Sequence, residues 1–263
     1  MRDVVRLKKP NERIAAFFDV DRTVVRGSTL LALAPVLYKD GLIGRRTVFR
    51  AIRRQLRFSH GGLDDQGLAR AAEDVASVIA GMDARQLRTL SEEHITSHIF
   101  PRIFPSALQL IEWHKQAGHE VYLVSSAPDE IVSEMARLLG LSGAIGTTAE
   151  VQDGHYTGKI LRFCHGATKA TAIEELARSR NINLKRSVAY SDSISDVPML
   201  SAVGRAVCVN PDKKLQEYAG THGWMSINFP GRRRTIRHPR KARNIAAPLS
   251  MVRPGADTSP FEL

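Results

Sequence analysis

The chain has 263 residues, a mass of 29.1 kDa and a formal net charge of +11 at pH 7, and 43% of its residues are hydrophobic. This composition is typical of globular proteins and excludes a wholly disordered or fibrous chain. The length allows one large domain or two modest ones around a sizeable core. The two cysteines, Cys164 and Cys208, cannot form a disulfide framework, which favours plain thiols in a reducing compartment.

Membrane and export signals are weak in this sequence. The longest apolar run, residues 30–38, is far shorter than the roughly 20 residues that a spanning helix needs. Residues 1–20 include basic side chains but lack the apolar segment and small-residue cleavage site of a secretory signal. We therefore expect a cytoplasmic protein.

Much of the positive charge lies at the C-terminal end. Residues 231–263 hold eight arginines and lysines and two acids, Asp257 and Glu262. A run of like charge is typical of a flexible tail that contacts anionic partners. We expect this basic tail to bind the inner membrane surface or an acidic partner. Specific nucleic-acid binding is not expected, because the arginine-rich part of the tail has no aromatic side chain for base stacking.

Short apolar runs alternate with helical patterns from residue 14 onward. The runs typical of buried parallel strands are residues 14–20, 121–125, 187–190 and 206–209. The predicted helices are residues 106–117, 129–139, 168–178, 198–203 and 213–218, and a β-hairpin is predicted at residues 149–160. This alternation predicts an α/β fold, a Rossmann-like three-layer core with a parallel sheet.

One long segment interrupts the alternation after the first strand. Between residues 27 and 97 no run is typical of a buried strand, and glycines separate helical patterns at residues 30–39, 45–58, 64–80 and 84–97. An insert of this size predicts a helical cap domain. The predicted domains are a core (residues 1–26 and 98–230), a cap (residues 27–97) and the basic tail (residues 231–263).

Two aspartates follow the first predicted strand. Asp19 and Asp21 stand where the strand gives way to a loop, so both carboxylates can face one pocket. One can attack as a nucleophile while the other acts as general acid and then base. The pair alone is a weak signal.

Two further segments suit a phosphate group. Ser125 and Ser126 end the second predicted strand, where hydroxyls and the following backbone N–H groups fit phosphate oxygens. Alternatively, Ser126 or Asp129 only caps the next helix. Lys169 lies near the start of a predicted helix, where it opposes the helix dipole, so an anionic ligand would explain it. The alternative is an ordinary surface lysine.

A second pair of aspartates, Asp192 and Asp196, follows the strand predicted at residues 187–190. Their oxygens suit Mg²⁺, which binds a few carboxylates and keeps several waters. The alternative is that Asp196, with Ser191 or Ser195, only caps a helix. In open α/β sheets the ligand crevice lies at the carboxyl ends of the strands, where these side chains are predicted to meet.

Together these segments resemble the four motifs of the haloacid dehalogenase superfamily of phosphohydrolases. The motifs are an Asp-x-Asp-x-Thr segment from Asp19 to Thr23, then Ser125, Lys169 and the pair of Asp192 and Asp196. A helical insert directly after the first motif resembles the phosphoserine-phosphatase-like subfamily IB. The similarity covers about residues 14–229. It implies a Mg²⁺-dependent phosphomonoesterase that forms an aspartyl-phosphate on a small phosphorylated substrate.

The resemblance also implies a role for each residue. Asp19 would be the nucleophile, Asp21 the general acid and base, and Lys169 the cation that neutralises the transferring phosphoryl group. The phosphate-binding residues would be Thr23, Ser125 and Ser126. The ligands of Mg²⁺ would be Asp19, the backbone carbonyl of Asp21, Asp192 and Asp196.

Two departures from the family pattern bear on the substrate. Ser191 stands where the fourth motif usually has glycine, which is a mild change. Phosphoserine-specific members usually carry a glutamate after the first motif, whereas residues 24–31 of this chain contain no acid. We therefore expect a small metabolite or a lipid-derived phosphate, rather than free phosphoserine, as the main substrate.

Two features favour a second hypothesis, in which the core is a scaffold for binding an anionic surface or a nucleic acid. One is the basic tail. The other is a stripe of arginines on the helix predicted at residues 45–58, namely Arg46, Arg50, Arg53 and Arg57. The stripe is alternatively a solvated face. Complete retention of the catalytic set argues against a binding-only core.

Overall fold

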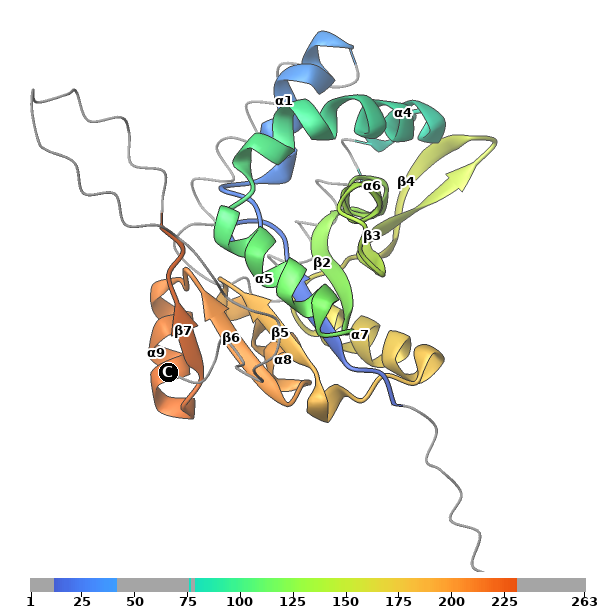
Figure 1. Ribbon diagram of the computed structural model, residues 1–263. Coiled ribbons are helices and arrows are strands. Elements are labelled where there is room, and N and C mark those ends of the chain that lie inside the picture. Colours follow the sequence, from blue (N-terminus) through green and yellow to red (C-terminus); the bar gives the residue numbers. More distant parts are fainter. Residues whose placement is uncertain (1–11, 42–75, 77–78, 231–263) are drawn as a thin grey trace, which may run out of the picture. The chain divides into compact units, whose positions relative to one another are not determined.

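A computed structural model describes residues 12–41, 76 and 79–230. In this part of the chain, seven strands form one sheet (Figure 1). The strands are β1 (Ala15–Asp19), β2 (Glu120–Pro128), β3 (Gly143–Gln152), β4 (His155–Arg162), β5 (Val188–Ser191), β6 (Arg205–Val209) and β7 (Met225–Ile227).

The strand order is β4-β3-β2-β1-β5-β6-β7, which puts β1 in the middle of the sheet. All neighbouring strands are parallel except β3 and β4, which form an antiparallel hairpin. The predicted parallel α/β sheet is therefore confirmed. The hairpin is part of the same sheet because the first half of β3 pairs with β2. Strand β7 was not predicted, because its three residues are exposed or only partly buried.

Helices connect the strands and lie against both faces of the sheet (Figure 1). The α-helices that the structure describes are α1 (Thr29–Lys39), α4 (Ala84–His94), α5 (Pro105–Gln116), α6 (Asp129–Leu138), α7 (Ala167–Arg180), α8 (Val197–Ser201) and α9 (Lys213–His222). Within the described ranges, every helix is too short or too polar to span a membrane.

The segment between β1 and β2 is helical where the structure describes it. Helix α4 continues as a π-helix, Ile95–Ile99, and a 3-10 turn, Phe100–Arg102, so the helical run does not stop at residue 97 as predicted. The helix predicted at residues 45–58, with its arginine stripe, and most of the one predicted at residues 64–80 lie outside the described residues. The division into core, cap and tail stays a prediction.

The chain just before α4 is bonded to the β3–β4 hairpin. Tyr156 of β4 accepts a backbone hydrogen bond from Gly81 (2.8 Å) and donates one to Met82 (2.9 Å). Ala84 donates to the carbonyl of Gly154 (2.9 Å), and Asp83 caps the start of α4 through the amide of Arg85 (2.7 Å). The hairpin therefore holds the start of α4 through backbone hydrogen bonds.

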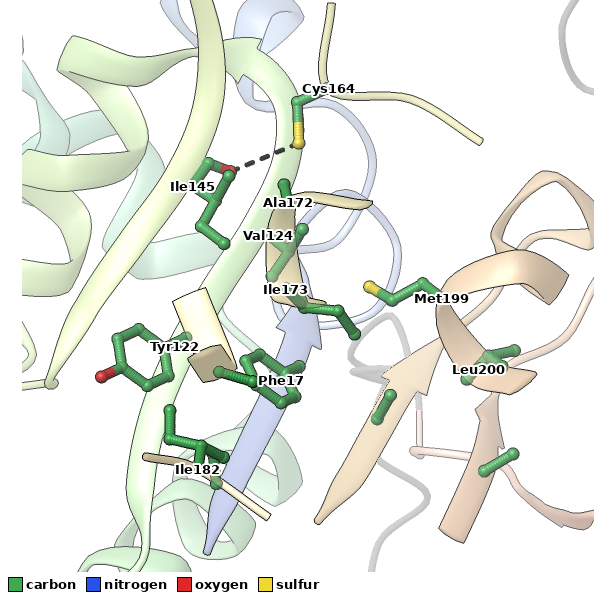
Figure 2. Packing of buried hydrophobic residues seen from close by; sticks show 14 of the residues in the cluster. Phe17, Tyr122, Val124, Ile145, Cys164, Ala172, Ile173, Ile182, Met199 and Leu200 are labelled. Atoms are coloured by element: carbon green, nitrogen blue, oxygen red, sulfur yellow. Dashed lines mark hydrogen bonds between the residues drawn. The ribbon is translucent and has the colours of Figure 1, made fainter. Parts of the chain in front are cut away.

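The core lies on both sides of β1, because successive strand residues point to opposite faces. Phe17 stacks on Tyr122 (ring centroids 5.7 Å apart) and joins a buried cluster with the inner faces of α7 and α8 (Figure 2). Residues of α9 belong to the same cluster. Phe18 points to the other face, where it stacks on Tyr190 (4.3 Å) and meets the edge of His114 from α5 (5.9 Å). Packing on both faces holds β1 in place in the sheet, and therefore also positions Asp19 at its carboxyl end.

His114 is a buried histidine that must stay neutral in the fold. Its Nε2 lies 2.8 Å from the Tyr190 hydroxyl and its Nδ1 lies 2.8 Å from Nδ1 of His119. Burial, with a smaller effect of His119, lowers the pKa of His114 to about 3. The unfolded chain binds a proton near pH 6.5, so the stabilisation from neutral His114 is complete above that pH and is lost as the pH falls toward 3.

We expect the free energy of unfolding to fall by about 2 kcal/mol more between pH 7 and pH 5 in the wild type than in His114→Gln. The glutamine keeps a polar partner for Tyr190 but does not titrate. Denaturant unfolding at the two pH values measures the difference. Equal falls in both proteins would show that His114 is not the titrating group.

Candidate active site

Three neighbouring strands bring the predicted catalytic residues to one edge of the sheet. In the register of the sheet, Asp19 of β1 lies opposite Val124 of β2, and Phe18 lies opposite Tyr190 of β5. Ser125 is therefore one position beyond Asp19 on one side, and Asp192 follows the end of β5 on the other. The aspartates and the serine meet at the carboxyl ends of the strands, as expected of an open α/β sheet.

Lys169 is at the centre of this group. Its Nζ donates hydrogen bonds to Asp19 Oδ1 (2.6 Å) and Asp196 Oδ2 (2.8 Å), and its side chain is only 3% exposed. Gly166, with a φ of 54°, turns the chain into α7 so that Lys169 lies in the first turn of that helix. The interpretation of Lys169 as a surface lysine is therefore wrong.

Asp196 is held from two sides. Its Oδ2 accepts a hydrogen bond from the Ser191 hydroxyl (2.6 Å) as well as from Lys169. Although Asp196 directly precedes α8, its side chain makes no capping bond to that helix. Among the described residues, nothing bonds the other oxygen, Oδ1, which is buried. A buried carboxylate oxygen without a partner has a free position for a cation or a water.

The charges of this cluster change the acidity of its members. Burial raises the pKa of Asp19 to about 6, against the opposing effect of Lys169. Burial and the nearby Asp19 raise the pKa of Asp192 well above its usual value. Burial alone would lower the pKa of Lys169, but Asp19 and Asp196 raise it by more, so Lys169 keeps its proton. The cluster therefore contains one fixed cation, Lys169, and a second cation would stabilise the ionised forms of its carboxylates.

Asp21 lies on the loop after β1 and is bonded to the start of α1. Its Oδ1 accepts hydrogen bonds from the backbone amide and the hydroxyl of Thr29, both at 2.9 Å. Burial raises the pKa of Asp21, while the bonds from Thr29 lower it in part. A raised pKa lets a carboxyl group carry a proton to a leaving oxygen near neutral pH.

We expect Thr29→Val to lower kcat about tenfold and to shift the pH–activity curve to higher pH. The Thr29 hydroxyl bond stabilises ionised Asp21, so its loss raises the pKa of Asp21. The steady-state pH profile of phosphate release measures both effects. Thr221→Val, an exposed threonine on α9, is the matched control. A profile that does not move in Thr29→Val would remove Thr29 from this role.

Arg22 and Thr23 complete the loop. The Nε of Arg22 lies 2.7 Å from Oδ2 of Asp192, so this side chain pairs with the carboxylate at the end of β5. Thr23 is buried, and among the described residues its hydroxyl has no hydrogen-bond partner. Backbone bonds from Val24 and Val25 to the carbonyl of Val20 curl the loop tightly.

The two serines of β2 differ in their surroundings. The Ser125 hydroxyl is buried and accepts a bond from the amide of Ala127 (3.2 Å). Ser126 is partly exposed, and its carbonyl accepts a bond from the Thr147 hydroxyl (2.8 Å). The strand continues past both serines to Pro128 rather than ending there as predicted, and its pairing with β3 is irregular between Val124 and Pro128. Neither Ser126 nor Asp129 caps α6, whose side-chain cap is absent among the described residues.

The donor set at this edge fits a hard divalent cation. All its ligand atoms are oxygens, which Mg²⁺ prefers, and Asp196 Oδ1 is buried without a partner among the described residues. In the described part of the chain, no group of three or more acidic, histidine or cysteine side chains is arranged so that it could hold a metal ion by itself. Mg²⁺ does not require one, because it keeps several waters and uses one or two carboxylates.

Known proteins are similar to this chain over most of its length. Residues 16–201 match the model of the haloacid dehalogenase-like hydrolases. The chain belongs to this family. A probable phosphatase of Mycobacterium tuberculosis is 40% identical over 84% of this chain and 77% of its own length. A phosphoserine phosphatase of the same organism is 37% identical over 90% of this chain and 76% of its own length.

Among solved structures, a Bordetella pertussis protein of unknown function is similar with a TM-score of 0.70 and 29% identity. The alignment covers 82% of this chain and 98% of that one. As a member of the haloacid dehalogenase-like family with relatives named as phosphatases, the chain is an enzyme of the phosphatase class.

Sequence reasoning missed three contacts in this site. It did not assign Arg22 or Thr29 a role, and it took the serine at position 191 as a mild change. In the structure, Arg22 forms an ion pair with Asp192, and the hydroxyls of Thr29 and Ser191 donate hydrogen bonds to Asp21 and Asp196. Their positions in the sequence could have indicated these contacts. Each of the three residues lies within one of the two aspartate motifs or at the start of the helix that follows.

Proposed function

We propose that the enzyme hydrolyses phosphate monoesters of small metabolites or lipid-derived phosphates, with Mg²⁺, through an aspartyl-phosphate on Asp19. The observation that carries the proposal is the buried triad of Asp19, Lys169 and Asp196, with its bonds of 2.6 and 2.8 Å. A carboxylate held next to a buried cation, at the carboxyl end of a central strand, suits attack on a phosphorus atom.

In the first half of the reaction, a carboxylate oxygen of Asp19 attacks phosphorus and the bond to the leaving oxygen breaks. Asp21 donates its proton to that oxygen, which leaves as an alcohol. Lys169 neutralises the charge of Asp19 and of the phosphoryl oxygens as they approach. Thr23, Ser125 and Ser126 bind the phosphoryl group through hydroxyl and backbone N–H groups.

In the second half, ionised Asp21 takes a proton from a water molecule. The water oxygen attacks phosphorus, the bond to Asp19 breaks, and inorganic phosphate leaves. Asp21 is then protonated again for the next turnover. The raised pKa of Asp21 supports both roles, because the group must hold a proton in one half and release it in the other.

The proposed ligands of Mg²⁺ are Asp19, the backbone carbonyl of Asp21, Asp192 and Asp196. When bound, the ion would supply positive charge that offsets the repulsion between the carboxylates and the phosphate. The buried, unpartnered Oδ1 of Asp196 supports a cation here.

The first turn of α1 supports a substrate other than phosphoserine. It contains no acid that would hold a substrate amine. The nearby charged residue before this helix is basic: the guanidinium carbon of Arg26 lies 5.0 Å from the centre of the Phe104 ring.

The insert of residues 27–97 is proposed to act as a cap that admits the substrate and excludes bulk water.

The test is phosphate release from a panel of an aryl phosphate, phosphoserine, sugar phosphates and lysophosphatidate, with Mg²⁺ or with EDTA. The proposal expects release that requires Mg²⁺ and is slower for phosphoserine than for the best substrate. Release that persists unchanged in EDTA would contradict the metal requirement. Phosphoserine as the best substrate would contradict the proposed specificity.

A separate proposal concerns the basic tail. Its eight basic and two acidic residues support salt-sensitive binding to anionic surfaces, in a cytoplasmic protein that is peripheral at the inner membrane surface. The chain reaches residue 230 near the catalytic loop, since Asn210 accepts a bond from the Phe229 amide (2.8 Å) and donates one to the Arg22 carbonyl (3.3 Å). Retention on anionic liposomes at low salt should drop when residues 231–263 are deleted; unchanged retention would contradict it.

A further inference from the structure

We infer that Arg22 is a positioning residue that orients the Asp192 carboxylate for a divalent cation. The Nε of Arg22 forms an ion pair with Oδ2 of Asp192, at a distance of 2.7 Å. The Asp192 side chain is 4% exposed, whereas that of Arg22 is 38% exposed, so the arginine reaches in from the rim of the site. With Oδ2 engaged, Oδ1 of Asp192 is the oxygen left for a cation.

The backbone of Arg22 is held in an unusual conformation. Its φ is 65°, in the left-handed region that favours glycine, so an arginine there costs free energy. Its amide donates to the carbonyls of Val25 (2.7 Å) and Gly27 (3.1 Å), and its carbonyl accepts from Asn210 (3.3 Å). These three bonds fix where the side chain starts, and therefore aim it at Asp192.

Backbone hydrogen bonds position the main chain of Asp192, but they do not orient its carboxylate. Its carbonyl accepts a bond from the amide of Asp212 (2.7 Å), whose side chain in turn accepts from the amide of Ile194 (3.0 Å). These bonds place the start of the loop after β5, while the ion pair with Arg22 sets the rotation of the carboxylate. Residues that orient a metal ligand in this way typically change metal affinity 10- to 100-fold when they are removed.

The charge of Arg22 does not make the site a poor one for a cation. Asp19, Asp21, Asp192 and Asp196 bring four carboxylates to this edge, and Lys169 and Arg22 bring two fixed cations. Two negative charges remain uncompensated when all four carboxylates are ionised, and one remains when Asp21 holds its proton, so this edge stays negative for a cation. Orientation by Arg22 is therefore expected to outweigh its repulsion of the ion.

This inference rests on the metal site of the proposed function, so the test measures metal binding directly. Mn²⁺ serves as the probe, and electron paramagnetic resonance measures free Mn²⁺ in titrations without substrate. We expect Arg22→Gln to weaken Mn²⁺ binding about tenfold and Arg22→Lys, which keeps the charge, to stay within about threefold of the wild type. Arg13→Gln is the matched control: Arg13 also pairs with an acid, Glu120, but at the opposite ends of the strands.

A positioning role predicts a specific split in activity. The Mg²⁺ concentration for half-maximal phosphate release should rise in Arg22→Gln by the factor seen with Mn²⁺, while turnover at saturating Mg²⁺ returns to within about twofold of the wild type. The metal-free melting temperature should fall only slightly, because the lost ion pair involves an arginine side chain that is 38% exposed. A purely structural role would instead lower that temperature strongly, and Mg²⁺ would not restore turnover.

The outcomes separate the two claims. If the wild type binds Mn²⁺ and Asp192→Asn does not, but Arg22→Gln binds as tightly as the wild type or more tightly, the inference about Arg22 is overturned and the metal site stands. If the wild type does not bind Mn²⁺ at all, both the metal site and the role of Arg22 are overturned.

Discussion

Asp19→Asn is expected to lose at least about a thousandfold in phosphate release while the protein stays folded. The amide is a poor nucleophile, yet it has nearly the same size as the carboxylate, and Lys169 keeps its second partner, Asp196. Initial rates with an aryl phosphate and Mg²⁺ measure the loss, and denaturant unfolding measures the fold.

The matched control for this variant is Asp153→Asn. Asp153 lies exposed in the turn of the β3–β4 hairpin, and its φ of 50° is one that asparagine adopts readily. The control should keep wild-type turnover. If Asp19→Asn also kept it, Asp19 would not be the nucleophile, and the order of events proposed for the site would be wrong.

Lys169→Met is expected to lower activity at least about a hundredfold and to destabilise the metal-free protein by about 3 kcal/mol at pH 7.5. The lysine is buried with two carboxylates within 2.8 Å, so its loss leaves buried charges without a partner. Unfolding in EDTA measures the stability, and rates at saturating Mg²⁺ measure the activity. Lys159→Met, which removes an exposed lysine paired with Glu150, is the control.

The destabilisation of Lys169→Met should depend on pH in a defined direction. Removing the cation raises the folded-state pKa of Asp19 above its wild-type value of about 6, further above the value in the unfolded chain. For an acid of this kind, stability is lost as the pH rises through the folded pKa and is regained as the pH falls. The deficit should therefore be smaller at pH 5 than at pH 7.5. A deficit that is equal at both values, or larger at pH 5, would contradict an uncompensated carboxylate cluster.

The sheet and the polar residues at its edge could be predicted because strand burial leaves a strong signal. The apolar run before Asp19 and the one before Asp192 form β1 and β5, which are neighbours, so their ends meet. The position of Lys169 needed the family resemblance, since a lysine early in a helix is equally typical of a surface. Its burial between Asp19 and Asp196 depends on contacts 150 and 27 residues apart in the sequence.

Other features could not be predicted for physical reasons. The contact of Arg22 with Asp192 depends on a left-handed backbone that only the folded loop imposes. The short strand β7 has little burial, and an exposed edge strand has no alternation of polar and apolar residues to detect. The strand β2 continues through Ser125 and Ser126 because β3 pairs beyond them, and that pairing is not local in sequence.

The most direct test of the account is to look for phosphate on Asp19. Wild-type enzyme is mixed with ³²P-labelled substrate and Mg²⁺, quenched with acid within milliseconds, digested and mapped. We expect a labelled peptide that contains Asp19, that loses its label in hydroxylamine as an acyl phosphate does, and that is absent in Asp19→Asn. Turnover without any labelled peptide, or label on a different residue, would show that Asp19 does not carry the phosphoryl group.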